Sequence, residues 1–160
     1  MSHSSRPKEP IFSAISVGFF LILAGAIFAH AAFVTKTNLF NEISAFFQDF
    51  EIVKVPNTEA FSLPAPESPR RHLDVYSALF KFSLVWGFYQ IAILAVRFMV
   101  GSPLDKKAET VSNLVFWFGA SYLLNAYLIK TTVWFEFWAL IIVLAGISLI
   151  ARAIVLAFRS

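Results

Sequence analysis

Residues 85–100, VWGFYQIAILAVRFMV, decide the fold, because in this apolar run only Gln90 and Arg97 are strongly polar. The run begins near Val75, and a helix needs about 20 apolar residues, at about 1.5 Å each, to cross a membrane. Similar runs occupy 11–34, 112–129 and 133–160. The sequence therefore predicts an all-α integral membrane protein with four transmembrane helices in a bundle.

Composition supports the membrane prediction. The chain of 160 residues is 58% hydrophobic and only 14% charged, whereas soluble domains are about 25% charged. The formal net charge of +3 comes from basic residues that flank the apolar runs, so the lipid bilayer is the expected partner and nucleic acid is not. The absence of cysteine excludes disulfides, thiolate nucleophiles and cysteine metal sites.

The polar stretches between the runs define the other segments. Residues 1–10 form a polar tail, 101–111 an inner connection that starts the third helix, and 130–132 a short outer turn. The long outer loop, 35–74, contains an amphipathic helix at about 38–50, followed by a proline-rich extended segment. Cleavage of the first run as a signal peptide at the AHA sequence of 29–31 is the alternative to a retained span, but its length favours retention.

The distribution of Lys and Arg predicts the orientation, because basic residues accumulate on the cytoplasmic side. With both termini on the cytoplasmic side of the cell membrane, seven basic residues lie inside: Arg6, Lys8, Arg97, Lys106, Lys107, Arg152 and Arg159. Five lie outside: Lys36, Lys54, Arg70, Arg71 and Lys130. Four aromatic residues near the outer ends are expected to form an interfacial belt: Tyr76, Tyr127, Trp134 and Trp138.

Polar side chains also follow one face of the second and third helices. Gln90 falls near the midplane, and Asn113, Ser121 and Asn125 recur at multiples of four residues. An amide in hydrocarbon needs a partner, so the two polar faces are expected to meet. They then provide either interhelical hydrogen bonds or a polar pathway or ligand pocket.

Two charged residues of the second helix have different expected roles. Arg97 lies close to the hydrocarbon edge, so its side chain is expected to reach the headgroups, with ligand or lipid phosphate binding as the alternative. Lys81 lies on the outer side of the midplane and slightly deeper in the membrane than Arg97. It is therefore the first charged residue that we expect to have a functional role.

Two histidines, His30 and His72, are placed at the same outer membrane level. Such a pair could hold haem iron or another metal, but no carboxylate or further histidine completes a cluster on these helices. The favoured interpretation is two unrelated histidines, with neither a metal nor a cofactor.

Function is predicted mainly by exclusion. No catalytic motif occurs in a sensible context, and no acid lies in the middle of an apolar run. Small residues at positions 14, 18, 25 and 29 share one face of the first helix, which suits close helix packing. We expect a structural or accessory subunit without catalytic activity. It packs against another membrane protein or forms a homo-oligomer. The alternatives are a channel or transporter with a pathway between the second and third helices, and a membrane redox or haem protein using His30 and His72.

Overall fold

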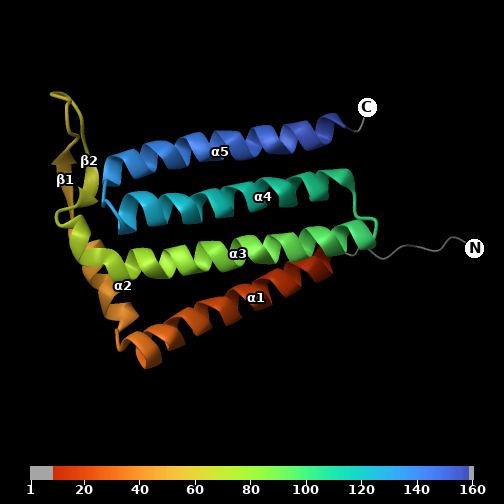
Figure 1. Cartoon of the computed structure of the whole chain (residues 1–160), viewed down its shortest axis with the longest axis horizontal. Helices are drawn as coiled ribbons and strands as arrows, with labels where there is room; N and C mark the ends of the chain where they lie inside the picture. Colours follow the sequence, from red (N-terminus) through yellow and green to blue (C-terminus); the bar gives the residue numbers. More distant parts are fainter. Residues whose placement is uncertain (1–8, 159–160) are drawn as a thin grey trace, which may run out of the picture.

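The computed structural model describes residues 9–158, and four long helices lie side by side in it (Figure 1). In chain order these are α1 (Glu9–His30), α3 (Leu73–Met99), α4 (Leu104–Leu123) and α5 (Trp134–Ala157). Neighbouring helices run in opposite directions, so α1 begins and α5 ends at the same end of the row. We call this the inner end and the opposite one the outer end.

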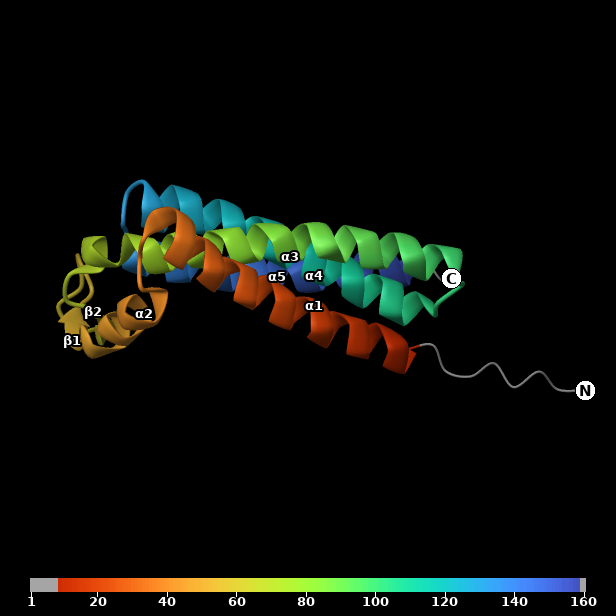
Figure 2. The ribbon, with the colours of Figure 1, turned by 90° about the horizontal axis from the view of Figure 1, so that it is seen from below.

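The outer end is covered by the loop between α1 and α3. The short helix α2 (Leu39–Gln48) and the strands β1 (Phe50–Lys54) and β2 (Ser62–Pro66) lie across the ends of the long helices (Figures 1 and 2). Asn38 begins α2, and its side-chain oxygen accepts a hydrogen bond from the backbone N–H of Asn41, which satisfies one of the free donors of a first turn.

Three further turns of helix refine the predicted boundaries. The π-helix η1 (Ala31–Thr35) continues α1, the 3-10 helix η2 (Pro69–His72) precedes α3, and the π-helix η3 (Leu124–Ile129) continues α4. The first helix already includes Glu9, two residues before the predicted start. Pro10 is tolerated there because first-turn N–H groups have no helical partner. The rest of the predicted tail, residues 1–8, lies outside the described residues.

Three segments within residues 9–158 are long and apolar enough to cross a membrane: Glu9–Thr35, Pro69–Met99 and Trp134–Ala157. The predicted third span, 112–129, is not one of them. Its helix α4 starts with charged turns that include Asp105 and Glu109, and it carries Asn113 and Ser121 farther along. The mostly helical fold is confirmed, while a bundle of four spans is not.

The centre of the bundle is α4, which packs between α3 and α5. Its contacts are close at two glycines. A Cβ atom on Gly87 of α3 would lie 3.3 Å from the Phe118 ring, and one on Gly119 would lie 2.8 Å from Cδ2 of Leu144 on α5. Small side chains therefore allow both neighbours to approach α4 closely.

Aromatic side chains form the core beneath α2. The Phe46 ring packs against the rings of His72, Tyr76 and Trp134, with centroid distances of 5.3, 6.1 and 6.0 Å. Tyr76 is only 1% exposed and Trp134 only 9%. The expected interfacial belt is therefore wrong for these two residues, because α2 covers them. Trp138, 46% exposed, remains available to the surroundings.

The extended part of the outer loop folds into a hairpin. Strand β1 pairs antiparallel with β2, and Phe50 stands opposite Pro66 while Lys54 stands opposite Ser62. Two prolines are tolerated in β2 because a strand of a two-stranded sheet leaves every other N–H unpaired. The sequence predicted the extended conformation here but not the pairing, which joins residues 50–54 to 62–66.

Candidate functional site

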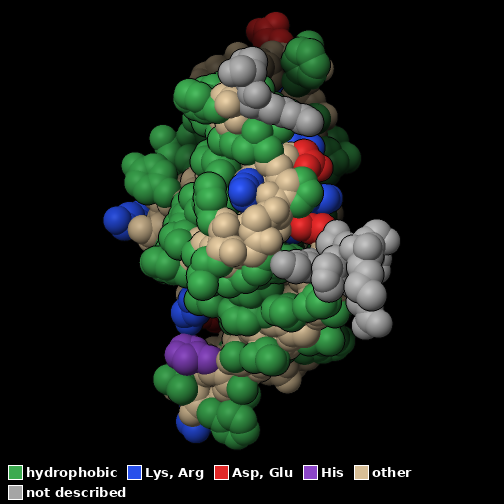
Figure 3. Space-filling model, turned by 90° about the vertical axis from the view of Figure 1, so that its right-hand side faces the viewer, with side chains coloured by type: hydrophobic (Ala, Val, Ile, Leu, Met, Phe, Trp, Pro, Cys, Tyr) green, Lys and Arg blue, Asp and Glu red, His purple; other side chains and the backbone are tan. Residues whose placement is uncertain are grey.

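A polar groove opens at the inner end of the bundle, between residues 9–16 of α1, 86–97 of α3 and 106–113 of α4. We call it the inner groove; its volume is about 520 Å³. Phe12, Trp86 and Ile93 provide apolar walls, and charged side chains stand at its inner edge. Figure 3 shows this end of the molecule, where acidic and basic side chains lie beside each other amid hydrophobic surface.

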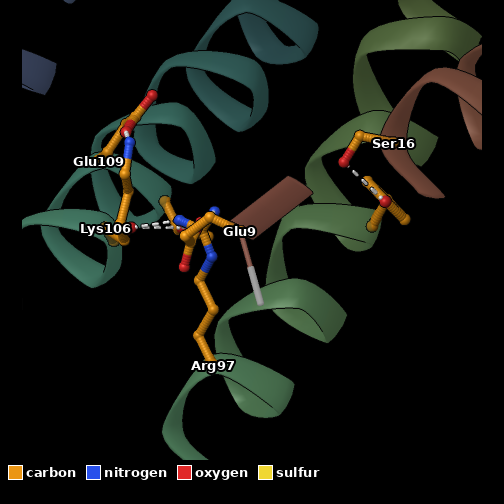
Figure 4. Close-up of polar contacts among 7 residues, drawn as sticks. Glu9, Ser16, Arg97, Lys106 and Glu109 are labelled. Carbon is orange, nitrogen blue, oxygen red and sulfur yellow. Dashed lines mark hydrogen bonds and ion pairs between the residues drawn. The ribbon is translucent and has the colours of Figure 1, made fainter. Parts of the chain in front are cut away.

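Arg97 connects three helices at the edge of the inner groove. Its Nη2 donates to Oε2 of Glu9 on α1 over 2.8 Å, and its Nη1 donates to the carbonyl of Lys106 and to Oγ1 of Thr110 on α4, over 2.5 and 2.7 Å (Figure 4). The guanidinium also lies 5.2 Å from the centre of the Phe12 ring. The Arg97 side chain, 12% exposed, thus has protein partners on α1 and α4.

The second charged pair of the inner groove lies within α4. Nζ of Lys106 is 3.4 Å from Oε2 of Glu109, one turn farther along (Figure 4). Two cations and two carboxylates therefore border the groove, and each cation has a carboxylate partner. The groove offers no excess of either charge to a ligand.

The uncharged polar residues predicted to form a site are only partly brought together. Gln90 and Asn113 both line the inner groove. Gln90 is 7% exposed, yet its side-chain amide has no hydrogen-bond partner among residues 9–158. Asn113 is exposed and its amide likewise has no partner in the described chain. Ser16, on the opposite wall, bonds the Tyr89 hydroxyl at 2.9 Å.

The remaining members of the predicted polar face lie elsewhere. Ser121 is buried and donates to the carbonyl of Phe118 in its own helix, and Asn125 lies in η3. Between these residues and Gln90, the Phe118 ring packs on Gly87 and fills the seam between α3 and α4. Of the two predicted polar faces, only Gln90 and Asn113 therefore share the inner groove, and no hydrogen bond joins these two side chains in the described residues.

Lys81 lies near the outer end, beside His30. Its Nζ is 3.5 Å from Nδ1 of His30, and both line a small pocket of about 50 Å³ with Asp74 and three hydroxyl-bearing residues. This pocket lies between the end of α1, the start of α2 and the first turns of α3. Lys81 is thus separate from the inner groove, to which Gln90 and Arg97 belong.

His72 has a different environment from His30. It is 4% exposed, and its Nε2 lies 2.8 Å from Oδ2 of Asp49. A carboxylate can only accept, so Nε2 carries the hydrogen, and Nδ1 has no partner. The same Asp49 oxygen accepts from the backbone N–H of Ser68. The bond from His72, and then that from Ser68, lowers the pKa of Asp49 below its ordinary 3.8.

The structure gives the two histidines different partners and so does not make them a pair. No group of three or more His, Asp or Glu side chains within residues 9–158 is arranged to hold a metal ion. The sequence reasoning missed Glu9 and Asp49, the two carboxylates with distant cationic or imidazole partners. Glu9 could have been found, because an acid at the start of the first helix and Arg97 at the end of the second fall at the same level.

Comparison of the chain with known protein families, with characterised proteins and with solved structures gives no match.

Proposed function

We propose that the chain is a small multi-pass membrane protein that acts as a structural or accessory subunit and packs against another membrane protein. In this proposal α4 also crosses the membrane, as the third of four spans, since it runs antiparallel between α3 and α5 along the row. The charged residues 105–109 then lie at the inner surface, and the turn at 130–132 lies outside. Both termini are on the cytoplasmic side of the cell membrane. This agrees with the fold, because α1 begins and α5 ends at the same end of the row.

The observation that carries the proposal is the open face of α1. A Cβ atom added at Gly18 or Gly25 would meet no heavy atom within 4 Å, and Ala14 and Ala29 are exposed. The small residues predicted to pack closely are therefore unused within the described chain, whereas Gly87 and Gly119 are filled by neighbours. A strip of small residues lets a partner helix approach closely, which is the main source of helix association in lipid.

The outer loop gives further support to a packing role. Leu39 of α2 is buried against the bundle, while Phe40 and Phe47 are 72% and 69% exposed. A helix that lies across the ends of the spans with exposed aromatic rings suits the boundary between headgroups and acyl chains, or the flank of a partner at that level.

Extraction in a mild detergent, followed by size-exclusion chromatography and mass spectrometry, tests the proposal. We expect a complex larger than the monomer, which Gly25→Leu disrupts. Gly146→Leu is the matched control, since Gly146 of α5 is equally open but lies on the opposite flank of the row. If the wild-type protein itself elutes as a monomer without partners, the accessory role is contradicted. Loss of the complex only in Gly146→Leu assigns the interface to α5.

The proposed number of spans has its own test, because the chain contains no cysteine. Single cysteines at Asp105 and at Thr131 can be labelled with a membrane-impermeant maleimide. If α4 crosses the membrane, Thr131→Cys reacts in intact cells and Asp105→Cys reacts only after lysis. Reaction of both residues from the same side means that α4 does not cross.

A further inference from the structure

We propose that the inner groove binds an uncharged amphiphile whose head carries hydrogen-bonding carbonyl groups, the chemistry shared by quinones and acylglycerols. The first reason is the position of Gln90. Gln90 as a residue is only 7% exposed, it lines the groove, and its side-chain amide has no hydrogen-bond partner among residues 9–158. Buried amides in folded proteins are nearly always hydrogen-bonded, so the unmade bonds of Gln90 indicate a partner that comes from outside the chain.

A second amide borders the same space. Asn113 extends from α4 on the other side of the groove from the α1 wall, and its side chain also lacks a partner in the described chain. Each amide offers two N–H donors and one acceptor. Two such groups on different helices match a head that has more than one carbonyl or hydroxyl oxygen.

The paired charges at the inner edge favour a head without net charge over an ionic head. Glu9 pairs with Arg97, and Lys106 pairs with Glu109. The Nη1 donors of Arg97 bond the Lys106 carbonyl and Thr110, while its Nε has no partner among the described residues. A phosphate would compete with Glu9 for Arg97, and an uncompensated carboxylate is costly at a partly buried site. A ligand without net charge leaves both pairs intact.

The size and the walls of the groove fit an apolar ring or chain attached to such a head. The volume of about 520 Å³ lies within the usual range of small-molecule sites. Phe12, Trp86 and Ile93 supply apolar contacts next to the amides. The groove is bounded by α1, α3 and α4, and it reaches from the charged inner edge to Ser16 and Trp86.

Native mass spectrometry of the full-length protein, delipidated in detergent, tests the proposal with three probes: decylubiquinone, monooleoylglycerol and dioleoylphosphatidylglycerol. We expect one of the two uncharged probes to bind, and the probe that binds distinguishes a quinone site from an acylglycerol site. Gln90→Leu should weaken that binding by about tenfold, the effect of losing one good hydrogen bond. Asn125→Leu is the matched control, because it removes an amide outside the groove.

Three results would overturn the proposal. The first is no binding of either uncharged probe, which means that the groove holds only water. The second is binding that Gln90→Leu leaves unchanged. The third is preferential binding of phosphatidylglycerol that Lys106→Gln abolishes, which identifies an anionic headgroup site. If Gln90→Leu fails to fold, Asn113→Ala replaces it, because Asn113 is exposed and its truncation leaves the packing intact.

Discussion

Nη2 of Arg97 lies 2.8 Å from Oε2 of Glu9, although the two residues are 88 positions apart in the chain. This ion pair attaches the first turn of α1 to the last turns of α3, and the other Arg97 bonds reach α4. The inner ends of three helices thus converge on one guanidinium.

Replacement of Arg97 by Met should lower the free energy of unfolding by roughly 1–3 kcal/mol. The variant leaves the partly buried Glu9 carboxylate without its cationic partner, whereas the Lys106 carbonyl keeps its bond from Thr110. Arg152→Met is the matched control, because Arg152 lies on α5, is exposed and has no ion-pair partner in the described chain. Unfolding in mixed micelles measures the free energy of unfolding of both variants. Equal values for Arg97→Met and Arg152→Met would show that the Arg97 bonds do not contribute to stability.

Gly119→Ala should destabilise the bundle by about 1–3 kcal/mol, because overpacking a filled contact forces neighbours apart. The new methyl would meet the buried Leu144 side chain. Gly146→Ala, where a methyl meets nothing within 4 Å, should not lower stability. The double variant Gly119→Ala, Leu144→Ala should lose less stability than the sum of the two single-variant losses, because the shorter side chain makes room for the new methyl. Additive effects would argue against direct contact.

The attachment of α2 should weaken in acid. The native pKa of Asp49 is depressed, so its bond with His72 contributes stability that is present above the ordinary value of 3.8 and is lost as the pH falls below it. Hydrogen-exchange protection factors of residues 39–54, each taken relative to the unfolded rate at the same pH, measure the release between pH 6 and pH 3. Asp49→Asn should exchange faster at pH 6 and show less change between the two pH values. A wild-type difference retained in Asp49→Asn assigns the effect to other groups.

Gln90→Leu should leave the free energy of unfolding of the ligand-free protein unchanged or raise it. The Gln90 amide bonds no other helix among residues 9–158, so Leu removes an unsatisfied polar group without breaking a contact. Unfolding with and without added lipid extract checks this. A loss of about 1 kcal/mol in the delipidated protein would instead mean that Gln90 joins helices, as the sequence first suggested.

The apolar runs by themselves determined the helical architecture. The positions of the long helices, of α2 and of the extended residues after it all follow from local patterns, because runs of apolar residues, caps and prolines act over a few positions. The third predicted span, 112–129, was the one long helix within residues 9–158 that local apolarity did not identify as a membrane span. Its polar residues lower its apolarity, and the choice between a span and a packed helix depends on what α3 and α5 cover.

Only the tertiary structure decided which polar groups meet. The period of four along α4 placed Asn113, Ser121 and Asn125 on one face, yet only Asn113 borders the groove with Gln90. The pairs Glu9–Arg97 and Asp49–His72, and the burial of Tyr76 beneath α2, join residues from different elements. The sequence specifies which side chains are available for contact. The crossing of α1 over α3 and the folding of the outer loop back over the bundle select the partners, because a contact of a few ångströms depends on helix placement that no local pattern contains.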